Sequence, residues 1–280
     1  MRPIVVKKVY LYRYIIISGD LLRCNFQVFT NFVRKMEYNL AIDQGNSSSK
    51  LYLFAGLKLV ASRKVEHLTA SAIDDFVAGK DVRGAIISSV VGDDAEVVRR
   101  LAAFPQHIVL TASTPLPIAI DYSTPETLGR DRIAAAVGAR DAAGGSAVVV
   151  IDAGTAITLD VVDADGHYRG GNISPGVNMR FAALNHYTAR LPLLDSDGEI
   201  PDWGHDTATA IRSGVIGGVA GEIEGFVKRV ANRLGCKPQV WITGGDSAMI
   251  AQRLAIDTFQ DSYLLAKGLN RILIYNNENS

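Results

Sequence analysis

The amino-acid sequence predicts an α/β protein built from two similar halves. Short apolar runs typical of buried strands alternate with stretches in which apolar residues have helical spacing. A unit made of a strand, a turn of the form Asp-x-Gly followed by polar or small residues, and a second strand occurs twice, around residues 43–46 and 152–155. We interpret this repetition as an internal duplication, with one copy in each half.

The first half carries this pattern as follows. Strands are expected at residues 40–42, 51–54, 57–61, 84–91 and 108–110. The first turn joins the first two of these runs, and helical spacing at 95–104 separates the last two. This alternation of strand and helix is typical of the α/β class.

The second half repeats the opening and then becomes mainly helical. Strands are expected at 148–151, 157–162 and 240–242, with a hairpin turn at 163–166. Helices are expected at 177–191, 207–234 and 263–274. The helix at 207–234 has the strongest pattern, and Thr207 is placed to cap or open it.

Charge and cysteine content argue against several classes of protein. Basic and acidic residues number 29 each, so the chain lacks the excess positive charge of a nucleic-acid or polybasic membrane surface. Its two cysteines, Cys24 and Cys236, make neither a disulfide framework nor a zinc site. We therefore expect a cytoplasmic protein with no nucleic-acid or membrane partner.

The first 35 residues differ from the rest, and we predict that this extension lies outside the working fold. The apolar run at 9–17 contains Arg13 and is too short to span a bilayer, and no small-residue cleavage site follows it. Met36 directly precedes the first clean strand pattern. We predict one domain at 36–145 and a second at 146–275.

The two glycine turns have the chemistry of a phosphate-binding site. A glycine lets backbone N–H groups approach phosphate oxygens, and Asp43, at a strand end, can hold Mg²⁺ directly or through water. The sequence has no Walker-type loop. Taken alone, either turn is better explained as an ordinary hairpin turn. The occurrence of two favours a nucleotide held between them.

Three further segments combine glycine or charge with a predicted turn. Residues 170–176 place Gly-Gly and Pro-Gly before a helix, which suits a ligand at a helix N-terminus. Residues 243–246 suit a wall of a nucleotide site or a simple strand-to-helix turn. In 122–132, Asp131 lies between two arginines, as a base for phosphoryl transfer to an alcohol would, although a solvated helix start is the plainer explanation.

Together these segments resemble the type III pantothenate kinases, a family in the superfamily of sugar and acetate kinases, heat-shock chaperone ATPases and actin. The family pattern is Asp-x-Gly-Asn-Thr, Tyr-x-x-Pro-x-x-Leu-Gly-x-Asp-Arg, Asp-x-Gly-Thr-Ala-x-Thr and Gly-Gly-x-Ile-x-Pro-Gly. These motifs stand here at 43–47, 122–132, 152–158 and 170–176, and Ser47 replaces the usual threonine. The resemblance covers residues 38–274. It implies two ribonuclease-H-like domains of the actin-like ATPase fold, with an interdomain nucleotide cleft.

The resemblance also implies an activity: ATP-dependent phosphorylation of pantothenate, the first step of coenzyme A biosynthesis. It implies that Asp131 accepts the proton and that Asp152 binds a monovalent cation (K⁺ or NH₄⁺), while Asp43 stays the candidate for Mg²⁺ from its place at the strand end. ATP contacts would come from Asp43, Gln44, Gly45, Asn46, Ser47, Ser48, Ser49, Lys50 and Thr155. Pantothenate contacts would come from Tyr122, Gly129, Arg130, Asp131, Arg132 and Thr207. A homodimer is implied as well.

Three other interpretations stay open. A related sugar or small-alcohol kinase would share the fold, although the segment 122–132 argues against it. A non-catalytic regulatory relative should have lost its acids, whereas Asp43, Asp131 and Asp152 are all present. A chaperone-type ATPase would need a substrate-binding domain for which 280 residues leave no room.

Overall fold

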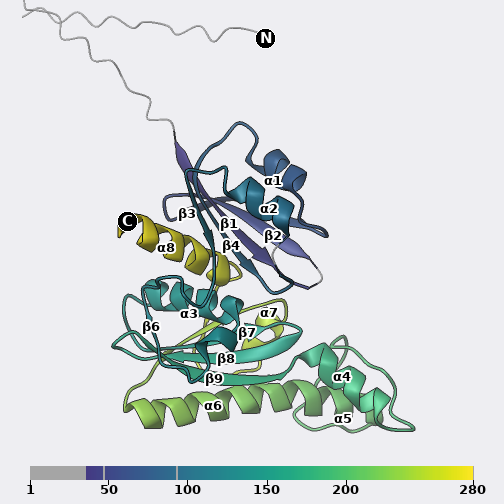
Figure 1. Cartoon of the computed structure of the whole chain (residues 1–280). Coiled ribbons are helices and arrows are strands. Elements are labelled where there is room, and N and C mark those ends of the chain that lie inside the picture. Colours follow the sequence, from purple (N-terminus) through teal and green to yellow (C-terminus); the bar gives the residue numbers. More distant parts are fainter. Residues whose placement is uncertain (1–35, 47, 93, 280) are drawn as a thin grey trace, which may run out of the picture. The chain divides into compact units, whose positions relative to one another are not determined.

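The computed structural model describes residues 36–46, 48–92 and 94–279 (Figure 1). Residues 36–280 group into one unit by their internal contacts. The predicted extension, residues 1–35, and the predicted ATP contact Ser47 lie outside the described residues.

The first sheet has five strands in the order β3-β2-β1-β4-β5. Its strands are β1 (Glu37–Gln44), β2 (Ser49–Ala55), β3 (Lys58–Val65), β4 (Asp81–Ser89) and β5 (Gln106–Val109). The pairs β1–β2 and β2–β3 are antiparallel, and β1–β4 and β4–β5 are parallel. Helices α1 (Ala70–Val77) and α2 (Ala95–Leu101) cover one face, where their apolar residues pack on alternate strand residues such as Leu40 and Ile42.

The second sheet repeats this plan and adds one strand. Its order is β11-β10-β7-β8-β9-β6. Its strands are β6 (Ala119–Ile120), β7 (Val148–Ala153), β8 (Ala156–Val162), β9 (His167–Pro175), β10 (Gln239–Thr243) and β11 (Phe259–Gln260). The pairs β7–β8 and β8–β9 are antiparallel, and β7–β10 and β10–β11 are parallel, as in the corresponding pairs of the first sheet. The added strand β6 runs parallel to β9. The predicted duplication and the α/β class are therefore confirmed.

Helices α3 (Arg130–Ala142) and α8 (Leu264–Glu278) share one core with both sheets. This core joins Ala41 and Ile86 of the first sheet to Val148 and Val150 of the second. The two helices meet at bare backbone: a Cβ on Gly268 would lie 1.8 Å from the Ala134 carbonyl oxygen. Only glycine allows this approach, so Gly268 permits the short distance between α3 and α8.

The remaining helices pack with the other face of the second sheet into a separate core that contains Val149, Ile151 and Phe226. They are α4 (Val177–His186), α5 (Thr207–Arg212), α6 (Gly218–Leu234) and α7 (Ser247–Ala251), and α6 runs along this side of the sheet (Figure 1). A short 3-10 turn, η1 (Pro125–Thr127), precedes α3. No helix among the described residues is long and apolar enough to cross a membrane.

Several predicted elements need correction at their ends. The helix expected at 177–191 ends at His186. The helix expected at 207–234 is continuous but contains a π-helical segment, η2 (Ser213–Gly217), between α5 and α6. Two glycines within η2 lower the local preference for regular α-helix. The helix expected at 263–274 continues to Glu278.

Candidate active site

Asp43 and Asp152 occupy equivalent places in the two halves. Each is the second-last residue of its strand, β1 or β7. Ala41 and Val150 lie two residues earlier and belong to the shared middle core. Because side chains alternate along a strand, both carboxylates lie on the faces that the two sheets turn to this core.

The neighbours of these two acids on adjacent strands are also equivalent. Across the antiparallel pairs, Asp43 is opposite Lys50 and Asp152 is opposite Thr158. Across the parallel pairs, Asp43 is beside Ser88, and Asp152 is beside Thr243. Each acid is therefore flanked on one side by a hydroxyl residue of the central parallel strand.

The electrostatics show that Asp43, Asp131 and Asp152 lie close enough to influence one another. Burial raises the pKa of Asp43 to about 6, and Asp131 adds to this increase while Lys50 opposes it. Burial also raises the pKa of Asp152 to about 6, with further increases from Asp131 and Asp43. We call these three residues the acid trio. Like charges held together in a partly buried place favour a bound cation.

Two predicted glycine segments pack directly against the second turn. Gly176 N–H donates to the Thr155 carbonyl at 3.0 Å, and a Cβ on Gly176 would lie 2.3 Å from the Gly154 carbonyl oxygen. Gly244 has φ +96°, and a Cβ there would lie 2.4 Å from the Ala153 carbonyl oxygen. The segments 170–176 and 243–246 are thus brought to the second turn, as a shared ligand site requires.

The predicted ATP contacts of the first turn do not all share a face. Lys50 is exposed and lies on the same face as Asp43. Gln44 and Ser49 lie on the other face, and Ser49 is buried there. The turn itself is closed by a hydrogen bond from Gly45 N–H to the Ser48 carbonyl at 3.1 Å. Thr155, the predicted ATP contact in the second turn, is exposed.

Asp131 lies in the first turn of α3. Gly129 is the N-cap residue of that helix, and Arg130 is its first residue. The Asp131 carboxylate accepts a hydrogen bond from the Arg132 backbone N–H at 2.8 Å. A negative charge at this end of a helix is favoured by the helix dipole. The helix start therefore holds the carboxylate beside Asp43 and Asp152.

The guanidinium of Arg132 does not pair with its neighbour Asp131 but with Asp160. Arg132 Nε and Nη2 donate to Asp160 Oδ1 at 3.0 and 2.6 Å, and the Tyr168 hydroxyl donates to the same oxygen at 2.5 Å. Arg132 also interacts with the Tyr122 side chain. This buried pair links the start of α3 to strands β8 and β9.

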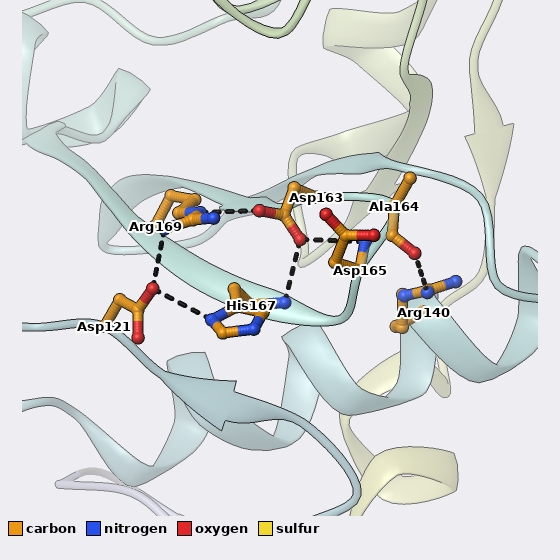
Figure 2. A network of polar contacts seen from close by, with 7 residues as sticks. All are labelled: Asp121, Arg140, Asp163, Ala164, Asp165, His167 and Arg169. Carbon is orange, nitrogen blue, oxygen red and sulfur yellow. Dashed lines mark hydrogen bonds and ion pairs between the residues drawn. The ribbon is translucent and has the colours of Figure 1, made fainter.

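A polar network at the edge of the second sheet fixes the segment that leads to Tyr122 (Figure 2). The Asp121 carboxylate contacts His167 Nδ1 at 2.9 Å and Arg169 Nη1 at 2.6 Å. Arg169 Nε donates to Asp163 at 2.6 Å. The network therefore ties β6 to β9, and it engages the Asp121 carboxylate away from the acid trio.

Thr207 has no hydrogen-bond contact with the acid trio among the described residues. It is an exposed residue in the first turn of α5. A cavity of about 680 Å³ lies elsewhere, beside the network of Figure 2, and is lined in part by Asp121, Arg169 and Arg229.

The donor set suits cations that are shared with a phosphate ligand. No group of three or more acidic, histidine or cysteine side chains in the described part of the chain is arranged to hold a metal by itself. Mg²⁺ in kinases is commonly held by one or two carboxylates together with phosphate oxygens and water. Asp43 and Asp152 fit that arrangement, because each has no ion-pair partner among the described side chains.

Sequence reasoning missed Ser88 as a member of this site, whereas Thr243 belongs to the segment 243–246 that was predicted to suit a wall of a nucleotide site. Residues 84–91 were interpreted only as a buried strand. The signal was present, since two serines interrupt an otherwise apolar run at the carboxyl end of that strand. Polar residues at the ends of neighbouring parallel strands are a common feature of ligand sites.

Comparisons with known proteins find relatives that match most of the chain. Three curated relatives are type III pantothenate kinases from Bacteroides fragilis, Cytophaga hutchinsonii and Porphyromonas gingivalis, which are 43%, 40% and 39% identical to the chain. The alignments cover 85%, 85% and 86% of this chain and 98%, 99% and 100% of those relatives.

Solved structures show the same fold at lower identity. A Baf family protein from Campylobacter jejuni matches with TM-score 0.57 and 23% identity, over 86% of this chain and 100% of that one. The Lmo2764 protein from Listeria monocytogenes, assigned as an N-acetylmannosamine kinase, matches with TM-score 0.51 and 14% identity, over 87% of this chain and 100% of that one. The fold is that of the actin-like ATPases. The family model for type III pantothenate kinases matches residues 39–229, and the chain therefore belongs to the type III pantothenate kinase family.

Proposed function

We propose that this chain transfers the terminal phosphoryl group of ATP to the primary hydroxyl of pantothenate, giving 4'-phosphopantothenate for coenzyme A biosynthesis. The observation that carries the proposal is the acid trio, which joins one acid from each half to the acid at the start of α3. Family membership supports the choice of substrate.

The site residues divide into three tasks. Asp43 and Lys50, with the backbone of both turns, hold the nucleotide. Asp131 takes the proton of the attacking hydroxyl, since it is the carboxylate placed at the start of α3 beside the strand-end acids. Tyr122, Gly129 and Arg130 hold pantothenate. Transfer is direct and needs no covalent enzyme intermediate.

Arg132 serves as a support in this scheme. Its side chain is 6% exposed, and its guanidinium pairs with Asp160, whose side chain is 1% exposed. It therefore fixes the first turn of α3, and with it Asp131, relative to β8. Any contact with pantothenate comes from the face of Arg132 that adjoins Tyr122.

Kinases of this family need a divalent metal ion. We assign Mg²⁺ to Asp43 and a monovalent cation, K⁺ or NH₄⁺, to Asp152. When bound, these cations neutralise phosphate charge at the two turns. The chain's contribution is to hold two carboxylates, which have no ion-pair partner among the described side chains, where that charge would gather.

The working form is proposed to be a cytoplasmic homodimer. Large apolar side chains are exposed on β9, at the end of α4 and on the segment before α5: Ile173, Tyr187, Leu193 and Trp203. A second copy of the chain would remove them from water. Light scattering should give twice the chain mass at working concentration, and a monomer mass would overturn this part of the proposal.

A substrate panel tests the activity. Phosphate transfer from ATP should be measured with pantothenate, common sugars and small alcohols, and the product should be identified by mass. Pantothenate should be the preferred acceptor, with product formation lost when Mg²⁺ is removed. Preference for a sugar would favour the sugar kinase alternative, and no transfer to any acceptor would favour a regulatory relative.

A further inference from the structure

One buried hydroxyl beside the acid trio lacks a hydrogen-bond partner in the described part of the chain. Ser88 is 1% exposed, and its Oγ has no partner among the described residues. Buried polar groups in proteins are nearly always hydrogen-bonded, so an exception at a ligand site needs an explanation. Neighbouring Ser89 shows the ordinary behaviour, because its Oγ donates to the Gly92 carbonyl at 2.9 Å.

The position of Ser88 points to Asp43 as the residue that it serves. The two residues are paired in the parallel register of β1 and β4. Ile86, two residues before Ser88, and Ala41, two residues before Asp43, belong to the same middle core. The hydroxyl and the carboxylate therefore lie on one face at the same level of adjacent strands.

The second half contains the same arrangement. Thr243 is buried and is paired with Asp152 in the parallel register of β7 and β10. Duplicated strands thus place a hydroxyl residue beside the strand-end acid twice, as serine in one half and threonine in the other. This recurrence ties the hydroxyl to the acid, since it is kept in both halves although residues 44 and 46 differ from their counterparts 153 and 155.

We propose that Ser88 is a positioning residue for Asp43: its hydroxyl donates to the Asp43 carboxylate when that carboxylate turns to the cation that accompanies the nucleotide. Among the described residues the hydroxyl has no partner, and ligand binding supplies one. This inference rests on the proposed function, because it takes Asp43 as part of a nucleotide and cation site.

Direct binding tests the inference without turnover. The probe is Mg²⁺ with the non-hydrolysable β,γ-imido analogue of ATP, measured by calorimetry on the full chain. Ser88→Ala should weaken binding about tenfold, the scale of one hydrogen bond to a charged group. Ser88→Thr keeps the hydroxyl and should retain most of the affinity. Ser89→Ala is the matched control and should leave the affinity unchanged.

Two further readouts separate positioning from packing. In the free protein, Ser88→Ala removes an unsatisfied buried hydroxyl, so its Tm should equal or exceed that of the wild type. In an Asp43→Asn background, the binding effect of Ser88→Ala should vanish, because the hydroxyl acts through Asp43.

Each contrary result has a separate meaning. Unchanged affinity in Ser88→Ala, an equal loss in the Asp43→Asn background, or a lower Tm in the free protein would overturn the role of Ser88. Wild-type binding of the probe without phosphorylation of pantothenate would overturn the proposed acceptor alone. No binding of the probe by the wild type would overturn both.

Discussion

Arg132 and Asp160 form a buried ion pair directly beneath the turn that carries Asp131. The two residues lie 28 positions apart in the chain, and both nitrogen-to-oxygen contacts reach one carboxylate oxygen. Removing one partner of a buried pair leaves a charge without compensation. Asp160→Ala should therefore lower the free energy of unfolding by roughly 3–5 kcal/mol, as measured by urea denaturation.

A surface pair provides the control for that change. Lys237 and Asp257 approach to 3.4 Å but are 84% and 94% exposed. Asp257→Ala should lower the free energy of unfolding by less than about 1 kcal/mol. Equal effects of the two substitutions would show that the Arg132–Asp160 pair does not support the fold.

Asp131→Asn should preserve the fold and nucleotide binding but lower turnover roughly a hundredfold or more, the usual scale for loss of a general base. Turnover with pantothenate and ATP checks this, with circular dichroism as the test of folding. Asp141→Asn, at the other end of α3, is the matched control and should keep normal turnover. If Asp131→Asn were as active as the wild type, water would be the remaining base, because Asp121 is engaged by His167 and Arg169.

Activity should depend on the monovalent cation and on Asp152. A carboxylate beside a phosphate-binding turn repels ATP unless a cation cancels its charge. The wild type should turn over faster in K⁺ or NH₄⁺ than in Na⁺ at equal ionic strength. Asp152→Asn should lose this difference. Equal wild-type rates in all three salts would assign Asp152 a different task.

The raised pKa values predict how stability changes with pH. The pKa values of Asp43 and Asp152 are each about 6 in the folded protein, above the ordinary 3.8. Between those limits the folded state binds more protons than the unfolded state, so these acids make the free protein less stable as pH rises from about 4 to 6. The loss levels off about one pH unit above the folded pKa, near pH 7, and is constant beyond it.

A double variant isolates this effect. Asp43→Asn with Asp152→Asn removes both titrating groups, so the wild type should lose stability relative to it between pH 4.5 and pH 7. Urea denaturation without ligand or metal at several pH values checks this. A stability difference that stays constant over the range would mean that neither pKa is raised.

A chain starting at Met36 should keep full kinase activity. Residues 36–280 form a unit by their own contacts, and the family model begins to match at residue 39. Relatives are covered almost completely by 85–86% of this chain. Turnover of the shortened chain, compared with the full chain at equal concentration, checks the prediction. A large loss would show that residues 1–35 belong to the working fold.

Local patterns were sufficient to predict most of the strands and the repeated plan. The turns at 43–46 and 152–155 mark the ends of the flanking strands, because glycine and aspartate interrupt apolar runs there. Helix α3 was harder to predict, because it is rich in alanine and buried on nearly all sides. Such a helix lacks the apolar stripe that periodicity detects.

Contacts between distant residues explain what the sequence could not predict. Asp131 lies between Arg130 and Arg132 in the chain, which suggested that both arginines interact with its carboxylate. In the fold, Arg132 instead forms an ion pair with Asp160, because β8 packs against α3. The Ser88–Asp43 pairing likewise depends on strand register between β1 and β4, which no local pattern encodes.

The duplicated strands are alike, but their electric charge is not. Lys50 stands opposite Asp43 across the first hairpin, whereas neutral Thr158 stands opposite Asp152 across the second. The first hairpin therefore carries a positively charged side chain opposite its acid, and the second hairpin carries a neutral one. A polyanion that meets both turns experiences a field with a direction, which favours one end-to-end orientation over its reverse. Two copies of one scaffold thus acquire polarity in part from the residue of the second strand that stands opposite each acid.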